Sequence, residues 1–335
     1  MERLILTTSA SGAGALIEAK LADCIIPLFP GFVWGPLPSP VELETRLSSR
    51  SVRPEAPGFH WLDFTGKRLE KLRTEGPGLI EFCGRFEAVE LWADPDPDDQ
   101  LTLIWLLDYL RHHAKAASKL TLIQAGVSPG NCEPEELARW RLVAAKIRSD
   151  HLEVASMAWQ AYLRPTPQDW FNLLADNLHV LPHLRHSVLE LLEELPMDAT
   201  GLGATEMRML ELISAGDMRP FEVFSRDTRG NKRRVFGYWE TGTLLDGLAH
   251  CSQPAVSGLD EGPFTLEMHD DRARYDRYRL SRLTLTTFGE AVLARSEDFR
   301  RHNPIHRWWG GTELTNDRLW RWDPANRALI APRAA

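Results

Sequence analysis

The stretch from Val89 to Leu101 constrains the fold more than any other part of the chain. A short β-like run, Val89 to Trp92, ends in four aspartates interleaved with prolines, and apolar residues then recur at helical spacing from Leu101 onward. A strand that leads through a polar loop into a helix is the repeating unit of α/β domains. Four carboxylates at one junction repel one another and raise one another's pKa unless they are solvated, paired or used. This stretch therefore predicts an α/β domain and marks a place for a site within it.

The same pattern recurs on both sides of this stretch. We expect further strands at Leu4–Thr8, Cys24–Phe29 and Lys119–Ile123. The first of them is followed by a break at Ser9–Gly14 and then by a helix over Ala15–Leu21, and the strand Val89–Trp92 is followed by the helix Gln100–His113. The proline-, glycine- and arginine-rich region up to Leu79 is expected to be a long connection with one or two short helices, and Leu79–Phe82 a short strand or a helix end. Residues 1–130 are thus predicted to form a mostly parallel, Rossmann-like sheet with helices on both faces.

The rest of the chain divides into three regions with different sequence patterns. Residues 131–198 carry helical apolar patterns broken by prolines, over Glu133–Ile147, His151–Leu163, Gln168–Ala175 and Leu181–Leu195, and are expected to be an all-helical linker domain. Residues 199–300 have the layout of a winged-helix-like α+β domain, with helices at Thr205–Ala215, Pro220–Ser225 and Tyr238–His250, a β-hairpin wing formed by Phe264–Met268 and Tyr275–Leu285, and a strand turning into a closing helix at Leu285–Leu293. Residues 301–335 form a tryptophan-rich tail that is expected to pack back on an earlier domain.

Composition narrows the class of protein. A chain of 335 residues exceeds one usual hydrophobic core, so two or three domains are expected, and a net charge of −8 argues against a protein that is basic throughout. The four cysteines are scattered, which fits reduced thiols better than disulfides or a zinc site. No signal-peptide pattern and no apolar stretch of bilayer length is present, so a soluble, cytoplasmic protein without a membrane partner is expected.

Two segments are candidates for a ligand site. If Leu4–Thr8 and Val89–Trp92 are parallel neighbours, the polar residues that follow them meet at the carboxyl edge of the sheet, where such folds bind ligands. The first segment offers hydroxyls and backbone N–H groups at a helix start, suited to an anion or phosphate, and the second offers carboxylates and an amide. The candidate ligand-binding residues are Ser9, Ser11, Gly12, Gly14, Asp94, Asp96, Asp99 and Gln100.

Other interpretations of these residues stay open. Ser9–Gly14 is neither a GxGxxG nor a P-loop sequence, and a tight structural turn without a ligand is the alternative interpretation. Asp94, Asp96 and Asp99 suit a divalent cation or acid–base chemistry, although the glycine and terminal glutamate of an EF-hand loop are missing and no metal site is assigned. The last aspartates also suit capping of the Gln100 helix. The sequence assigns no catalytic residue, no cofactor and no oligomeric state.

The winged-helix pattern raises DNA binding as an alternative. The basic residues that would contact DNA are Arg229, Lys232, Arg233, Arg234 and Arg274. Against this, the expected recognition helix opens with Tyr238-Trp239-Glu240-Thr241-Gly242, which has no arginine, asparagine or glutamine to read base edges. Nearby acids almost balance the arginines, so DNA is not the favoured partner. Trp308, Trp309, Trp320 and Trp322 suit either base stacking or a packed core.

The acidic motif and the tail together resemble a bacterial family known as domain of unknown function 1835, with its usual C-terminal companion region. The family pattern W-x-E-x-D-x-x-D-Q-L is similar to Trp92–Leu101, with Asp94 in the place of the glutamate. Gly31 to Trp34 replace the acidic and histidine residues that the family usually has before its Gly-Pro segment. The remaining matches are Leu4–Ala15, Gly35-Pro36-Leu37, R-W-x-G-G at Arg307–Gly311 and W-R-W-D at Trp320–Asp323. The resemblance implies shared architecture and no activity.

Three functional hypotheses follow. The first is a protein that binds a small anionic or nucleotide-like ligand at the carboxyl edge of the N-terminal sheet. The second is a winged-helix transcriptional regulator whose N-terminal domain senses such a ligand. The third is a protein-interaction adaptor without chemistry.

Overall fold

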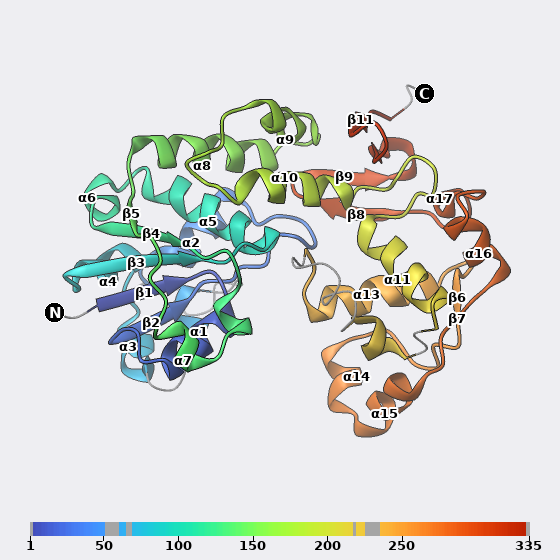
Figure 1. Cartoon of the computed structure of the whole chain (residues 1–335), viewed down its shortest axis with the longest axis horizontal. Coiled ribbons are helices and arrows are strands. Elements are labelled where there is room, and N and C mark those ends of the chain that lie inside the picture. Colours follow the sequence, from blue (N-terminus) through green and yellow to red (C-terminus); the bar gives the residue numbers. More distant parts are fainter. Residues whose placement is uncertain (1–2, 51–59, 65–68, 217–218, 225–234, 333–335) are drawn as a thin grey trace. The chain divides into compact units, whose positions relative to one another are not determined.

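The computed structural model describes residues 3–50, 60–64, 69–216, 219–224 and 235–332 (Figure 1). The chain forms two compact units. The first comprises Met1–Phe32, Leu37–Leu163 and Leu173–Ser187, and the second comprises Val33–Pro36, Arg164–Asn172 and Val188–Ala335. Residues 131–198, expected as one helical linker, divide between both units. Among the described residues, no helix combines the length and the apolarity needed to cross a membrane.

A five-stranded sheet forms the centre of the first unit, in the order β2-β1-β3-β4-β5. Its strands are β1 (Arg3–Thr7), β2 (Cys24–Pro27), β3 (Ala88–Ala93), β4 (Leu120–Gln124) and β5 (Ala145–Lys146). The first four pair in parallel, and β5 joins β4 antiparallel. The mostly parallel sheet is therefore confirmed, as is the parallel pairing of β1 with β3, in which Thr7 lies opposite Trp92.

Helices cover both faces of this sheet, with α5 and α8 on one side and α1 and α7 on the other (Figure 1). Ile5, Ala13 and Leu16 belong to a buried cluster beneath α1, and such burial on both faces explains why the strands read as continuous apolar runs. The helices of the first unit are α1 (Ala10–Glu18), α2 (Pro40–Leu47), η1 (Trp61–Phe64), α3 (Glu70–Glu75), α4 (Leu79–Gly84), α5 (Pro97–Leu110), α6 (Ala114–Ala117), η3 (Pro129–Asn131), α7 (Pro134–Leu137), α8 (Ser149–Tyr162) and η4 (Leu173–Ala175).

Two predictions in this unit are wrong. The expected loop Ser9–Gly14 is mostly helix, because Ser9 caps α1 and the helix already begins at Ala10. The expected helix Glu133–Ile147 exists only as the short α7. After it the chain is irregular and then adds the two-residue strand β5 to the sheet, while Trp140 and Leu142 pack against the cluster beneath α1. Apolar side chains spaced to cover a sheet can therefore imitate a helical pattern.

The second unit is mainly helical, with three short two-stranded sheets. Its helices are α9 (Gln168–Asn172), α11 (Ala204–Ser214), a helical segment over 220–224, α13 (Tyr238–Ala249), α14 (Leu266–Asp270), α15 (Arg272–Leu280), α16 (Thr287–Leu293), α17 (Phe299–His302) and η5 (Asn316–Arg318). In addition, α10 (Leu184–Glu193) begins in the first unit and continues into the second. The strand pairs are β6 (Val256–Ser257) with β7 (Thr284–Leu285), β8 (His306–Trp309) with β9 (Thr312–Thr315), and β10 (Arg321–Asp323) with β11 (Ala328–Ile330).

The predicted hairpin wing is wrong, because its two segments form α14 and α15. The Thr265 side chain accepts a hydrogen bond from the Met268 N–H and caps α14. The Asp271 side chain accepts from the N–H groups of Ala273 and Arg274 and caps α15. The Asp-Asp-Arg sequence that was expected as a hairpin turn therefore connects two helices and caps the second. Aspartate is common both in turns and at the N-cap of a helix, so the same residues suit either structure.

The C-terminal tail packs on α10 and on the segment after it. The Trp309 Nε1–H donates to the Leu191 carbonyl at 2.7 Å, and the Trp322 N–H donates to the Pro196 carbonyl at 3.0 Å. Trp322 is fully buried and Trp309 nearly so. These two tryptophans therefore serve as packed core and are not available for base stacking.

Candidate ligand site at the carboxyl edge of the sheet

The pairing of β1 with β3 brings the two predicted site segments together. The Thr8 N–H donates to the Trp92 carbonyl at 3.1 Å, and the Asp94 N–H donates to the Thr8 hydroxyl at 3.2 Å. Ser9 follows directly and begins α1. The strand order reverses between these two strands, because β2 lies on one side of β1 and β3 on the other.

Asp94 lies at the centre of a buried polar cluster, with 1% of its surface exposed. Its Oδ2 accepts a hydrogen bond from the Ser128 hydroxyl, and its backbone carbonyl accepts from the Gln100 side-chain amide at 2.7 Å. Two acceptors in this cluster, Asp94 Oδ1 and Gln100 Oε1, are buried without a hydrogen-bond partner in the described part of the chain. Buried acceptors are costly in that state, so these two atoms mark where a donor is missing.

The carboxyl groups of this cluster hold protons more strongly than free aspartates. Burial raises the pKa of Asp94 to about 6, with Asp96 adding to the rise and the hydroxyls of Ser128 and Ser9 opposing it. Burial also raises the pKa of Asp99 well above its usual range, and the neighbouring carboxylates reinforce the effect. Like charges crowded in a poorly solvated place favour retention of a proton. Carboxyls perturbed in this way are frequent at functional sites.

The other aspartates of the stretch play different parts. Asp96 occupies the N-cap position of α5 but makes no capping hydrogen bond through its side chain. The Asp98 Oδ1 accepts from the Phe32 N–H at 2.8 Å and so ties the segment after β2 to this edge. The last aspartates of the stretch, Asp98 and Asp99, lie in the first turn of α5, where a carboxylate complements the helix dipole.

The residues at the start of α1 form the opposite wall. The Ser9 hydroxyl accepts from the Gly12 N–H at 3.1 Å and lies 3.1 Å from the Ser11 hydroxyl. Gly12 is buried against Ser9, whereas Gly14 is exposed and faces open space. Because Ser9 already accepts from Gly12, that N–H is engaged by the protein itself.

Thr8 and Ser128 were missed by the sequence reasoning. Ser128 follows β4, caps the short helix η3 and reaches Asp94 across the edge. Its neighbour Gly130 passes so close to α1 that an added Cβ would lie 2.4 Å from the Ser11 hydroxyl oxygen. The available signal was positional, since hydroxyl residues just after parallel strands fall at the ligand edge of such sheets.

The cluster is richer in acceptors than in donors. It combines carboxylates, a side-chain amide and hydroxyls, so a ligand that donates hydrogen bonds matches it better than a bare anion. Within the described ranges, no group of three or more histidine, cysteine, aspartate or glutamate side chains is arranged to hold a metal ion.

Of the five basic residues named for the DNA-binding alternative, the structure describes Arg274. Arg274 donates to Glu261 at 2.9 Å and to the Gly262 carbonyl at 3.0 Å, so its guanidinium is engaged within the unit. The other four candidates, Arg229, Lys232, Arg233 and Arg234, lie outside the described residues.

Comparison of the chain with models of known protein families and with curated proteins found no match.

Proposed function

We propose that this protein binds a small nucleotide-like ligand at the carboxyl edge of β1 and β3. The observation that carries the proposal is the pair of buried acceptors without partners, Asp94 Oδ1 and Gln100 Oε1. Hydroxyl or amino groups of such a ligand supply the missing donors. Its anionic group takes the first turn of α1, where the helix dipole and the hydroxyl of Ser11 favour negative charge.

The position of the cluster supports the same proposal. Open α/β sheets bind ligands beyond the carboxyl ends of their strands, at the point where the strand order reverses. In this sheet that point lies between β1 and β3, next to Ser9 and Asp94. A Rossmann-like ligand mode is therefore part of the proposal. Kinship with the domain of unknown function 1835 family is also part of it, since the acidic motif of that family matches Asp96, Asp99 and Gln100, with Asp94 in the place of its glutamate.

A thermal-shift experiment on the full chain tests the proposal. Ribonucleoside monophosphates, the matching nucleosides, inorganic phosphate and Mg²⁺ are added separately at millimolar concentration. We expect a nucleoside monophosphate to raise the melting temperature by at least about 2 °C, because a ligand that binds only the folded state stabilises it. Phosphate alone is expected to shift it less.

Two variants sharpen this experiment. Asp94→Asn keeps the shape of the side chain and removes its charge, so it is expected to abolish the ligand-induced shift. Asp317→Asn changes an exposed carboxylate of the second unit and is expected to respond like the wild type. The proposal fails if no compound stabilises the wild type, or if Asp94→Asn responds identically.

The regulator and adaptor hypotheses have weaker support. The DNA-binding hypothesis relied on a hairpin wing and on a free Arg274 side chain. The expected wing segments form helices, and the Arg274 guanidinium is bound to Glu261. Binding of duplex DNA that weakens steeply with salt would favour the regulator over the ligand-binding proposal. No observation in the described residues favours the adaptor.

A further inference from the structure

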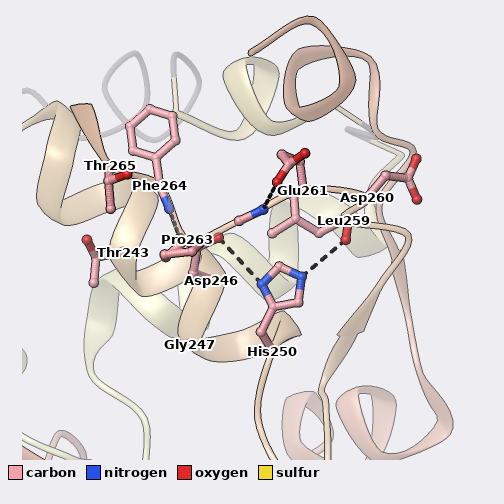
Figure 2. A pocket seen from close by; sticks show the side chains of 11 residues that line it. Thr243, Asp246, Gly247, His250, Leu259, Asp260, Glu261, Pro263, Phe264 and Thr265 are labelled. Atoms are coloured by element: carbon pink, nitrogen blue, oxygen red, sulfur yellow. Dashed lines mark hydrogen bonds and ion pairs between the residues drawn. The ribbon is translucent and has the colours of Figure 1, made fainter. Parts of the chain in front are cut away.

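The second unit contains a pocket that the proposed function does not use (Figure 2). One wall is a face of α13 from which Thr243, Asp246 and His250 project, and the other is the segment 259–265. Its volume is about 760 Å³. Pockets that bind small molecules have volumes of this order.

Asp246 is the buried charge of this pocket, with 8% of its surface exposed. Its Oδ2 accepts a hydrogen bond from the Phe264 N–H, which ties α13 to the opposite wall. Its Oδ1 is buried and accepts no hydrogen bond from any described residue. The side chain therefore has one satisfied oxygen and one that lacks a donor.

His250 lies beside this oxygen but does not satisfy it. The His250 Nδ1 is 3.7 Å from Asp246 Oδ1, which is longer than a hydrogen bond. The His250 Nε2 is 3.2 Å from the Leu259 carbonyl and donates a hydrogen bond to it. The dashed line between His250 and Asp246 in Figure 2 is this longer contact between Nδ1 and Oδ1.

The remaining lining gives the pocket a net negative charge. Asp260 is exposed at its rim. Glu261 is neutralised by Arg274 at 2.9 Å and Arg277 at 2.7 Å. Pro263 adds exposed apolar surface beside these acids.

We propose that this pocket binds an organic cation with N–H donors, an alkylammonium or alkylguanidinium group. The alkyl part lies along Pro263. The half-exposed His250 ring turns aside, and the N–H group donates to Asp246 Oδ1. A free amine and a lysine or arginine side chain of a peptide share this chemistry.

Calorimetric titration of the full chain at constant ionic strength tests the proposal with three probes. n-Butylammonium has the charge and the donors, tetramethylammonium has the charge without donors, and n-butanol has the alkyl chain without the charge. Saturable binding is expected for n-butylammonium, with at least about tenfold weaker binding of the other two, because charged hydrogen bonds are the stronger ones. Equal binding of tetramethylammonium, or no binding of n-butylammonium, would overturn the proposal.

Variants locate the site. Asp246→Asn is expected to weaken n-butylammonium binding at least about tenfold, and its near-UV circular dichroism shows whether the unit still folds. If it does not fold, Asp260→Asn at the exposed rim is the second variant, and it is expected to weaken binding about twofold to threefold because solvent screens its charge. His250→Ala uncovers Asp246 and is expected to bind at least as tightly as the wild type.

A control and a peptide complete the design. Asp270→Asn removes an exposed carboxylate outside the pocket and is expected to bind like the wild type. The peptide acetyl-Gly-Lys-Gly-amide distinguishes the two sources: tighter binding than n-butylammonium indicates a peptide side chain, and weaker binding indicates a free amine. Unchanged binding by the folded Asp246→Asn variant, or by Asp260→Asn in its place, would overturn the assignment to this pocket.

Discussion

At the residue scale, the central fact is that Asp94 is buried while it still carries a titratable charge. Burial raises its pKa to about 6, so its folded state holds a proton that the unfolded chain releases near pH 4. Stability attributable to this group is therefore complete below the unfolded pKa and falls as pH rises through the folded one. Buried carboxyl groups that lower the stability of the folded state in this way are frequent at sites of binding or chemistry.

We predict that Asp94→Asn stabilises the protein at pH 7. The amide keeps an oxygen that accepts from Ser128 and removes the buried charge. The gain is expected to be about 1–3 kcal/mol, since one pKa unit corresponds to about 1.4 kcal/mol. Urea denaturation from pH 4 to pH 8 measures it, and the variant should gain on the wild type mainly between pH 4 and 6. An equal pH dependence of the two proteins would contradict the assignment.

At the element scale, α1 is held by a close approach that only small residues permit. An alanine Cβ at position 130 would lie 2.7 Å from the Ser11 Cβ and 3.0 Å from its backbone carbonyl carbon. The helix and η3 are therefore fixed at a distance that joins Ser9 and Ser128 to one cluster. Gly14, in contrast, has no atom within 4 Å of an added Cβ.

We predict opposite effects for two glycine-to-alanine substitutions. Gly130→Ala pushes η3 away from α1 and is expected to lower the free energy of unfolding by about 1–3 kcal/mol. Gly14→Ala adds a better helix former on an exposed face and is expected to raise it by about 0.5–1 kcal/mol. Thermal and urea denaturation of both variants gives the comparison. Equal behaviour would show that the approach of η3 does not constrain α1.

At the scale of the whole molecule, a buried ion network unites distant segments of the second unit. Glu206 on α11 accepts from Arg300 at 2.8 Å and from Arg307 of the tail at 3.3 Å. Burial pushes the pKa of Glu206 upward, yet the two arginines bring it below its usual value. The arginine of the R-W-x-G-G motif therefore has a structural role, which connects the start of β8 to α11.

We predict that Arg300→Ala destabilises the second unit strongly, by about 3–5 kcal/mol, because it leaves a buried carboxylate with reduced compensation. The neighbouring Arg301 is a matched control, since its side chain is 77% exposed. Arg301→Ala is expected to change the free energy of unfolding by less than about 0.5 kcal/mol. Guanidinium denaturation followed by tryptophan fluorescence measures both, and similar losses would argue against the network.

The sequence by itself determined the parallel sheet and its acidic edge. The run Leu4–Leu6 is apolar on both faces, and only Glu90 interrupts the apolar run Val89–Trp92. Such runs are buried by a sheet that helices cover on both faces, and the pattern is local to each strand. Asp94 was found because it closely follows such a run, and Gln100 because it opens the helix that was predicted after it. Strands, and the polar residues that follow them, can be predicted from each segment of the sequence by itself.

Only the tertiary structure decided what depends on partners far along the chain. Ser128 joined the cluster because β4 lies beside β3, and its own neighbours carry no sign of that contact. The region 133–147 forms only a short helix before Ala145–Lys146 pair with the edge of β4. The expected wing became α14 and α15 because Thr265 and Asp271 cap helices there. The spacing of hydrophobic residues indicates which side chains are buried. It does not indicate which other part of the fold covers them.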